Sequence, residues 1–415
     1  MQKKVTIIGG GIIGLSTAYF LQKEGYEVTI IDSSNMDSGA SYSNAGYVCP
    51  SHFIPLAAPG VVRSGLRWML DASSPLYIKP SLKSDFLKWA WAFNKSATSS
   101  RVQKNAIHLR DFTVFSQELF QSIKKEEQFS FQYDKKGLLI LCQTECQLEK
   151  ELDILTIANS LNVHAKEISK AELKILEPSV QINSVGGVYF KNDHHSTPSD
   201  FMQQLKAHLR SKGVRILANE KALNFKMKQA KIISVVTDKQ TLYSDEFVIA
   251  SGSWSAGLCE KLDLKLLLQA GKGYSMNTQL STGITIPTIL AEAKTAVTPM
   301  DGFTRFAGTM EIAGINHHIN RKRVEVIAKA VHQYYPSIKL SALEIKAATC
   351  GLRPLSPDGL PYIGKPQSCE NMTIATGHAM LGWTLGPGTG KLVSELILNK
   401  KSSLDISPYH PNRKF

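Results

Sequence analysis

The sequence has no long hydrophobic run and few cysteines. No stretch of about 18 apolar residues occurs in its 415 residues, so we expect no membrane-spanning helix. The six cysteines are scattered, and the one close pair, Cys142 and Cys146, has no second pair at zinc-like spacing. No set of His, Cys and carboxylate residues shows metal-ligand spacing either. We therefore expect reduced thiols in a cytoplasmic protein and no metal site.

The sequence also lacks internal repeats, low-complexity linkers and any RNA- or DNA-binding signature, so we expect no nucleic-acid partner. Its formal charge is nonetheless +13, from 48 Lys and Arg against 35 Asp and Glu. Such a surplus attracts anions such as a dinucleotide or anionic lipid, and it suits a soluble basic enzyme equally well. The apolar N-terminus is broken by glycines and leads into a helical pattern, so we expect no signal peptide.

The start of the chain predicts a strand–helix–strand unit. Residues 5–8 form a short apolar run typical of a buried parallel strand. A helical pattern follows over residues 13–23 and is closed by Gly25, and residues 27–32 predict a second strand. This order is typical of the opening of an α/β fold with a parallel sheet.

Glycines at 9, 11 and 14 lie between the first strand and the helix, in the spacing G-x-G-x-x-G. Gly9 allows the tight turn, Gly11 lets the backbone approach a pyrophosphate, and Gly14 lets helix and strand pack closely. Free N–H groups at the helix start, where Ile12 and Ile13 lie, favour the negative charge of that pyrophosphate. The pattern therefore predicts dinucleotide binding.

An acidic residue follows at the end of the second strand. Asp32 lies where a carboxylate can accept hydrogen bonds from ribose hydroxyls, and its distance from Gly14 along the chain suits that role. Ser33 and Ser34 come directly after it. Strand, helix and acid together make the glycine motif specific. They do not separate NAD from FAD.

The rest of the chain alternates predicted helices and strands. We expect a long loop at 41–60 and helices at 105–125, 144–160, 170–176 and 319–334. A further helix is opened by Ser196-Thr197-Pro198, with a capping hydroxyl, and ended by Gly213. We expect strands at 186–190 and 214–217, a β-meander at 222–250, and antiparallel strands at 265–318. The C-terminal part of the chain returns to strand, loop, strand and helix. The two ends are expected to share one domain, with a β-rich second domain inserted between them.

Residues 63–95 hold Trp68, Met69, Leu70, Trp89, Trp91 and Phe93 among Arg and Lys. A basic, aromatic segment of this kind can lie on a membrane surface. A pair of helices packed on the core is the alternative.

Two later features favour FAD. One is the strand that ends at Ala250-Ser251-Gly252-Ser253-Trp254, and the other is the run from Thr373 to Thr384, a strand that leads into a helix start. A second helix N-terminus aimed at a flavin would stabilise the negative charge that develops near N1 and O2 on reduction. The alternative is a plain glycine-rich helix entry.

Several motifs in the right order resemble the D-amino acid oxidase superfamily of FAD-dependent oxidoreductases, and within it the bacterial D-amino acid dehydrogenase branch (small subunit). The resemblance covers nearly the whole chain. It is carried by Ser41-Tyr42-Ser43-Asn44-Ala45-Gly46 with Ala57-Ala58-Pro59-Gly60, by Gly351-Leu352-Arg353-Pro354-Leu355-Ser356-Pro357-Asp358-Gly359, and by Thr376-Gly377-His378 with Leu381-Gly382-Trp383-Thr384.

The resemblance implies an α/β (α+β) two-domain fold, a Rossmann-like FAD-binding domain with an antiparallel-sheet substrate domain. The FAD-binding domain would comprise residues 1–75, 160–256 and 345–400, the substrate domain 76–159 and 257–344, and residues 401–415 a tail. FAD would be bound non-covalently by the glycine motif and Asp32, Ser33 and Ser34, and further by Ser41, Asn44, Ala45, Gly46, Lys221, Gly252, Trp254, Gly377, His378, Leu381, Gly382, Trp383 and Thr384. The backbone of Lys221 would pair with adenine.

The resemblance also implies substrate-site roles. Arg353 would hold the substrate carboxylate, because a guanidinium offers a planar fork that matches it; the alternative is a structural salt bridge. Tyr274 could add a hydroxyl, or be a core tyrosine. Arg305 falls near a basic residue that faces the flavin and fits a dehydrogenase better than an oxidase.

Four further residues carry weaker implications. Residues 41–46, with 57–60 after them, resemble the family's flavin-contacting loop, here called the flavin loop. His52 follows residues 41–46 where the dehydrogenase branch has no histidine, so it marks a substrate difference or an ordinary surface residue. Glu311 is read as structural, and Cys350 lies near a position of covalent flavin attachment that this branch does not use. His194-His195 is read as a helix cap or loop.

The implied function is oxidation of the Cα–N bond of a small amino or imino acid, such as a D-amino acid, D-proline or hydroxyproline, with a quinone or other acceptor at the inner-membrane face. Three alternatives stay open: an oxygen-using glycine, sarcosine or D-amino acid oxidase, an NAD-dependent dehydrogenase, and a non-catalytic flavoprotein.

Overall fold

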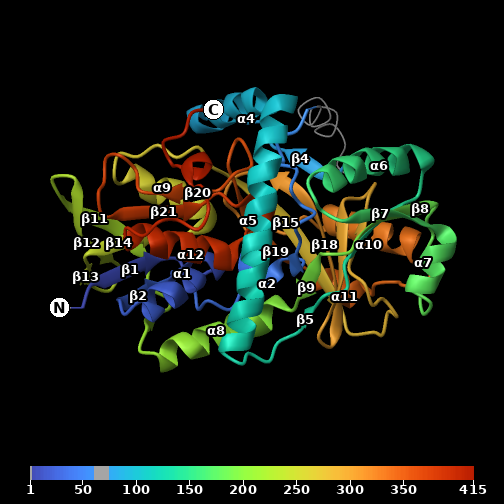
Figure 1. Cartoon of the computed structure of the whole chain (residues 1–415), viewed down its shortest axis with the longest axis horizontal. Helices are drawn as coiled ribbons and strands as arrows, with labels where there is room; N and C mark the ends of the chain where they lie inside the picture. Colours follow the sequence, from blue (N-terminus) through green and yellow to red (C-terminus); the bar gives the residue numbers. More distant parts are fainter. Residues whose placement is uncertain (1, 60–73) are drawn as a thin grey trace.

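The computed structural model describes residues 2–59 and 74–415 (Figure 1). Its two main sheets lie toward opposite ends of the long axis, and the long helix α5 (Ser99–Glu126) crosses the near face between them. Trp68, Met69 and Leu70 of the predicted basic, aromatic segment fall outside the described residues. Within the described ranges, no helix has both the length and the apolar character needed to cross a bilayer.

The first sheet has six strands, in the order β10-β2-β1-β14-β21-β20. Its strands are β1 (Lys4–Ile8), β2 (Glu27–Ile31), β10 (Arg215–Leu217), β14 (Glu246–Ile249), β20 (Tyr362–Gly364) and β21 (Met372–Thr376). All neighbours are parallel except β20 and β21. The prediction that both ends of the chain meet in one sheet is therefore confirmed. The order reverses between β1 and β14, and ligands of such sheets bind in the crevice beyond that point.

Helices α1 (Ile12–Lys23), α8 (Pro198–Ser211) and α12 (Gly386–Ile397) pack with α5 into the core of this sheet. From α5 come Leu109, Phe112 and Phe120, all fully buried. Such burial contributes roughly 1.5–3 kcal/mol for each large apolar side chain. The predicted start of α8 at Pro198 is confirmed, but the expected cap is wrong: no side chain caps the helix, and the Thr197 hydroxyl instead donates to Gln132 Oε1 (2.6 Å).

The second sheet has nine strands, in the order β19-β15-β18-β17-β16-β6-β8-β7, with β4 beside β18. Its strands are β4 (Leu76–Ile78), β6 (Leu138–Cys142), β7 (Ala165–Ser169), β8 (Gly186–Phe190), β15 (Gln269–Thr278), β16 (Thr288–Leu290), β17 (Thr295–Met300), β18 (Phe303–Ile312) and β19 (Thr349–Leu355). The pairs are antiparallel, as predicted, except that β16 runs parallel to β6 and β18 to β4.

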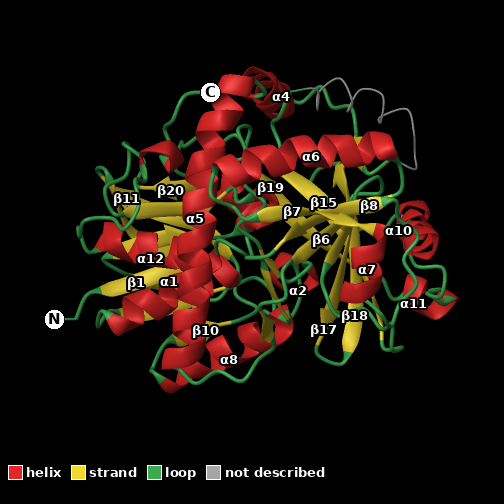
Figure 2. Ribbon diagram, turned by 45° about the vertical axis from the view of Figure 1, so that its right-hand side comes forward, coloured by secondary structure: helices red, strands yellow, loops and turns green. Residues whose placement is uncertain are grey.

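Five helices accompany this sheet: α4 (Ser84–Ser96), α6 (Glu145–Ser160), α7 (Lys170–Leu176), α10 (Arg321–Tyr334) and α11 (Ala342–Lys346). Figure 2 shows α6 lying across its strands. In α4, Trp89 is buried and its indole N–H donates to Leu355 O (2.9 Å), whereas Trp91 is exposed. The described part of the predicted aromatic segment thus packs one face on the core.

Two small sheets complete the architecture. The predicted meander is confirmed as β11 (Ala222–Lys228), β12 (Lys231–Thr237) and β13 (Thr241–Tyr243). In the other, β9 (His194–Ser196) pairs with β3 (Tyr47–Val48) and β5 (Tyr133–Asp134). The cap-or-loop interpretation of His194 and His195 is therefore wrong, since both are buried strand residues.

The predicted domain ranges do not coincide with the strands that each main sheet contains. β7, β8 and β19 belong to the nine-stranded sheet, although the sequence places residues 160–256 and 345–400 with the dinucleotide-binding part. The predicted ranges also place α5 with the substrate domain, whereas it packs on α1 and α12. The exact division of the chain stays a prediction.

Candidate active site

A cavity of about 1060 Å³ lies between the six-stranded and the nine-stranded sheets. Its walls come from the carboxyl ends of β1, β2, β14 and β21 and from β15, β18 and β19. The predicted site residues that line it are Gly9, Gly11, Ile12, Ile13, Asp32, Ser33, Ser34, Ser41, Asn44, Ala45, His52, Lys221, Gly252, Trp254, Tyr274, Arg353, His378, Leu381, Gly382, Trp383 and Thr384. Four do not line it: Gly14, Gly46, Arg305 and Gly377.

The glycine motif shapes the turn between β1 and α1. Gly9 has φ +115°, where residues with side chains are strained, and a Cβ there would strike Ala250 O on the neighbouring strand. A Cβ on Gly14 would strike Gly9 O. Gly14 therefore allows the close packing predicted for it without itself facing the cavity.

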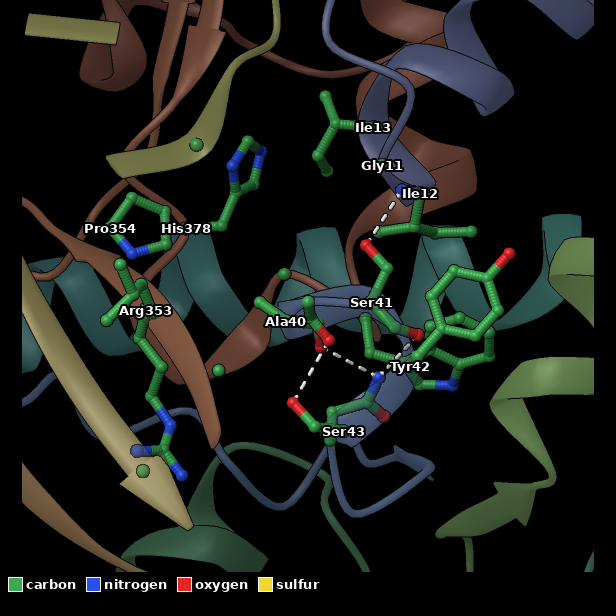
Figure 3. A pocket seen from close by; sticks show the side chains of 18 of the residues that line it. Gly11, Ile12, Ile13, Ala40, Ser41, Tyr42, Ser43, Arg353, Pro354 and His378 are labelled. Carbon is green, nitrogen blue, oxygen red and sulfur yellow. Dashed lines mark hydrogen bonds between the residues drawn. The ribbon is translucent and has the colours of Figure 1, made fainter. Parts of the chain in front are cut away.

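A serine caps the start of α1. Ser41, on the short helix α2 (Ala40–Ser43), accepts a hydrogen bond from Ile12 N at 3.0 Å (Figure 3). Asn44 braces the same loop: its side-chain amide donates to Ser41 O (2.9 Å) and its Oδ1 accepts from Gly46 N (2.8 Å). The predicted flavin loop is thus packed against the helix N-terminus that the pyrophosphate is expected to occupy.

Asp32 is held in place by its neighbours. Oδ2 accepts from Gly10 N (2.7 Å), and Oδ1 accepts from both the N–H (2.8 Å) and the hydroxyl (2.7 Å) of Ser34. A carboxylate oxygen has further lone-pair directions, so the group can still accept from a ribose hydroxyl. The geometry fits the predicted role.

The backbone of Lys221 is held by Asp238. It lines the cavity, but its backbone N–H donates to Asp238 Oδ1 (2.8 Å) and its carbonyl accepts from Asp238 N (3.0 Å). The carbonyl oxygen has a second lone-pair direction, so the pairing of this backbone with adenine stays a prediction. Ala222, the next residue, also lines the cavity.

The segment after β21 runs along the cavity before α12 begins at Gly386. Trp383 donates its indole N–H to Ser196 Oγ (3.1 Å), and Thr384 donates its hydroxyl to Tyr47 O (2.8 Å). The backbone N–H groups of residues 382–384 meet no hydrogen-bond acceptor in the described part of the chain. Such free donors suit the electronegative edge of a flavin.

His378 and Trp254 also line the cavity. Burial lowers the pKa of His378 to about 3, so its ring is neutral, and Nε2 lies 2.9 Å from the Thr389 hydroxyl. Trp254 is about half exposed and stacks on His317 at 6.0 Å between ring centroids. Neither side chain is charged, so both can face an apolar or aromatic ligand without adding a net field.

Arg353 reaches the cavity from β19 (Figure 3). Its guanidinium lies over Gly273 of the neighbouring strand β15, where a Cβ would overlap it. Nη1 donates to Thr309 O (3.1 Å) and approaches Met310 Sδ (4.0 Å), and no Asp or Glu in the described ranges pairs with it. Burial lowers its pKa to about 10, so the group still carries its charge near neutral pH. The structural-salt-bridge alternative finds no support here.

Tyr274 also lines the cavity, but its hydroxyl is engaged. It donates to Glu311 Oε2 (2.7 Å) and accepts from Asn320 N (3.3 Å). Glu311 in turn pairs with the buried Lys272 at 3.2 Å. The structural interpretation of Glu311 agrees with this buried network, and the hydroxyl of Tyr274 belongs to the network as well.

Arg305 lies behind the flavin loop instead of facing a ligand. Its Nε donates to Asn277 Oδ1 (2.9 Å), and its Nη1 donates to Tyr42 O (2.6 Å) and Asn44 O (2.8 Å). Its placement therefore does not support the interpretation that it distinguishes a dehydrogenase from an oxidase. It fixes the loop on which Ser41 lies.

His52 lines the cavity, and it does not lie on the surface as one alternative had it. Donor atoms of Cys49, His52 and Asp193 lie within 4.8 Å of one another, although the sequence predicts no such convergence. Asp193 was missed because it lies far from His52 in the sequence and no motif connects the two. Cys350 lines the cavity too, with its thiol 3.6 Å from His317 O.

These observations fit an FAD molecule. The glycine turn, the start of α1 and Asp32 lie together at the strand reversal, and the free N–H groups of 382–384 come just before Gly386, which packs against Ile12. The fold and the site together define a dinucleotide-binding protein with a mixed α/β, two-domain fold.

Comparison with known proteins identifies the family. The model of the DAO family, FAD dependent oxidoreductase, matches residues 4–396. The chain is 32% identical to a D-amino acid dehydrogenase of Vibrio vulnificus over 98% of this chain and 99% of the relative, and 29% identical to one of Granulibacter bethesdensis over 97% of each. The chain therefore belongs to the DAO family of FAD-dependent oxidoreductases.

Solved structures show the same fold. Glycine oxidase from Geobacillus kaustophilus superposes with a TM-score of 0.78 at 20% identity, covering 100% of both chains. L-proline dehydrogenase from P. horikoshii gives 0.74 at 19% identity, covering 99% of this chain and 97% of that one.

Proposed function

We propose that this enzyme oxidises the Cα–N bond of a small amino or imino acid whose carboxylate is held by Arg353. The observation that carries the proposal is a charged guanidinium in the cavity with no acidic partner among the described residues. A carboxylate is the complementary ligand, because it can accept two parallel hydrogen bonds from this group. The names of the D-amino acid dehydrogenase relatives support the same substrate class.

The chain's part in the reaction is binding and orientation. FAD, when bound, supplies the acceptor for the hydride that leaves Cα. Arg353 fixes one end of the substrate, so that the Cα–H is presented in one direction. Alignment of this kind lowers a barrier by about 7 kcal/mol in well-oriented cases. The substrate amine must be neutral, because its lone pair assists the departure of the hydride.

D-alanine-like acids and cyclic acids such as D-proline or hydroxyproline both suit this arrangement. We favour the cyclic group because His52, which lines the cavity, departs from the general D-amino acid dehydrogenase pattern. The imino product of an open-chain acid hydrolyses in water, whereas a cyclic imine persists.

An anaerobic screen tests the proposal. Amino acids of both configurations, glycine derivatives and prolines are mixed with the FAD-loaded enzyme, and loss of flavin absorbance is followed. Arg353→Ala should raise the half-saturating substrate concentration about 10- to 100-fold, as expected for about 1.5–3 kcal/mol of charge-assisted hydrogen bonding. Arg210→Ala, at an exposed arginine on α8, is the control. Bleaching that is unaffected by Arg353→Ala would contradict the proposed role of this residue.

We further propose that electrons pass to a quinone or similar acceptor at a membrane face. The supporting surface is on α4, where Leu87 and Trp91 are 50% and 64% exposed and Lys95 Nζ lies 4.9 Å from the Trp91 ring. Exposed apolar and basic side chains on one helix suit an anionic lipid surface. Steady oxygen consumption with peroxide release would instead favour an oxidase.

A further inference from the structure

A hydrogen-bonded chain of three side chains leads from the cavity into the interior. His52, at the cavity wall, has Nδ1 3.2 Å from Ser51 Oγ. The Ser51 hydroxyl donates to Asp193 Oδ2, and the Ser51 N–H donates to Oδ1 of the same carboxyl group (3.1 Å). Ser51 thus bridges a ring that lines the cavity and a carboxyl group behind it.

Asp193 is a buried acid without a basic partner. It is 0% exposed in the turn between β8 and β9, and no Lys or Arg of the described ranges pairs with it. Taking a carboxylate out of water disfavours its charge, so burial raises the pKa of Asp193 to about 7, against the opposing effect of hydrogen bonds from Ser51 and Cys49. Near neutral pH this group can therefore both bind and release a proton.

Four titratable groups that pack around the three residues are neutral. Cys49 and Tyr47, at β3, and Tyr189, on β8, have their pKa raised by burial and stay protonated. His194, on β9, has its pKa lowered by burial to about 4 and stays unprotonated. Asp193 is thus the group of this cluster that changes its charge near pH 7.

We propose that His52, Ser51 and Asp193 form a proton relay that accepts the proton of the substrate ammonium group. The inference rests on the proposed function, because that reaction requires a neutral amine. One N–H bond of the ammonium breaks and its proton binds His52 Nε2. The proton on His52 Nδ1 moves to Ser51 Oγ, and the Ser51 hydroxyl proton moves to Asp193 Oδ2. One proton is transferred in total and no electrons change hands.

His52 without its two partners would be a poor acceptor for the ammonium proton. Burial lowers the pKa of His52 to about 4, so an imidazolium at this position is disfavoured. When a proton passes through the ring, the ring stays neutral, and Asp193 changes from a carboxylate to a carboxylic acid. After the product leaves, the same path run backwards returns the proton to the cavity.

The test is the pH dependence of flavin reduction in the FAD-loaded, full-length enzyme. Reduction by D-proline and by D-alanine is followed by anaerobic stopped flow from pH 6 to pH 10. Ser51→Ala interrupts the relay and leaves both ends in place, so we expect a loss of about 10²- to 10⁴-fold at pH 7. The loss should shrink toward pH 10, where the amines are increasingly neutral in solution. Ser51→Thr should restore the rate.

His52→Gln should give the same profile as Ser51→Ala, and it is the second variant if Ser51→Ala fails to fold. His164→Gln, at an exposed histidine, is the matched control and should leave the profile unchanged. A loss that is equal at every pH, or no loss, overturns the relay. A metal ion bound in stoichiometric amount in the wild type and lost in His52→Gln also overturns it, because the ion would occupy the lone pairs that carry the proton.

The outcomes separate the two proposals. If no compound of the anaerobic screen reduces the flavin of the wild type, the proposed function fails and the relay fails with it. If the wild type is reduced and Arg353→Ala weakens binding, but Ser51→Ala shows no pH-dependent defect, only the relay fails.

Discussion

The position of the Arg353 side chain depends on the absence of a side chain at Gly273. The guanidinium occupies the space over Gly273 that a Cβ would fill. We expect Gly273→Ala to displace the guanidinium and to raise the half-saturating substrate concentration at least about tenfold, which corresponds to about 1.4 kcal/mol. Flavin content should stay unchanged, because Gly273 lies on the nine-stranded sheet, whereas the glycine motif follows β1 of the six-stranded sheet.

A double-mutant cycle tests this prediction. If Gly273 acts through Arg353, Gly273→Ala should have little further effect in the Arg353→Ala background. Additive losses would show instead that Gly273 contacts the substrate directly, and would contradict the displacement.

At the residue scale, the sequence predicts local motifs better than distant partners. Gly9, Gly14 and Asp32 were identifiable because the chemistry of a phosphate turn sets their spacing within one strand–helix–strand unit. Ser51 and Asp193 carry no such signal, since a strand pairing brings them together from distant parts of the sequence. Arg305 was misplaced because proximity to a motif does not fix the direction of a long side chain.

Among the elements, α12 lies unusually close to its neighbours because of its glycines. A Cβ on Gly390 would strike the backbone of Ser16 in α1, and one on Gly388 would come within 2.8 Å of Phe112 in α5. We expect Gly390→Ala to push α12 from α1 and to destabilise the fold by about 1–3 kcal/mol, as overpacking does. The measurement is the shift of the urea unfolding midpoint of the apoprotein.

Gly257→Ala is the matched control for that measurement. Gly257 lies in α9 (Ser255–Glu260), where a Cβ meets no atom within 4 Å, so the added methyl group should stabilise the helix by up to about 1 kcal/mol. Equal shifts in the two variants would contradict the packing argument.

The longer elements were predictable and the shortest were not. Periodic apolar positions predicted the helices now seen at Glu145–Ser160 and Lys170–Leu176 with almost the same bounds. β9 escaped because a short strand of His and Ser has no apolar alternation. Its pairing partners, β3 and β5, are shorter still, so tertiary contacts define all three strands.

For the whole molecule, buried histidines predict sensitivity to acid. Burial lowers the pKa of His52 and His194 to about 4 and that of His378 to about 3, from an ordinary 6.5. The unfolded chain therefore binds protons below pH 6.5 that the folded chain does not, and stability falls as the pH drops from 6.5 toward 4. Asp193 acts in the opposite sense, because its raised pKa contributes stability at low pH that is lost as the pH rises to about 7.

The melting temperature at pH 7.5 and at pH 5 measures this sensitivity. We expect a lower melting temperature at pH 5 than at pH 7.5. This difference should be smaller in His194→Gln, because the substitution removes one titrating group. His164→Gln, at an exposed position, should keep the wild-type difference. An unchanged difference in His194→Gln would contradict the assignment of His194.

The walls of the cavity are drawn from segments as far apart as residues 8–13 and 375–384. A ribosome that has synthesised everything up to β19 has made the glycine turn and Arg353, but not β21 or the N–H groups of 382–384. The nascent chain at that stage exposes an open half-site. Both parts of the site can therefore hold FAD only after the segment that contains residues 382–384 has been synthesised.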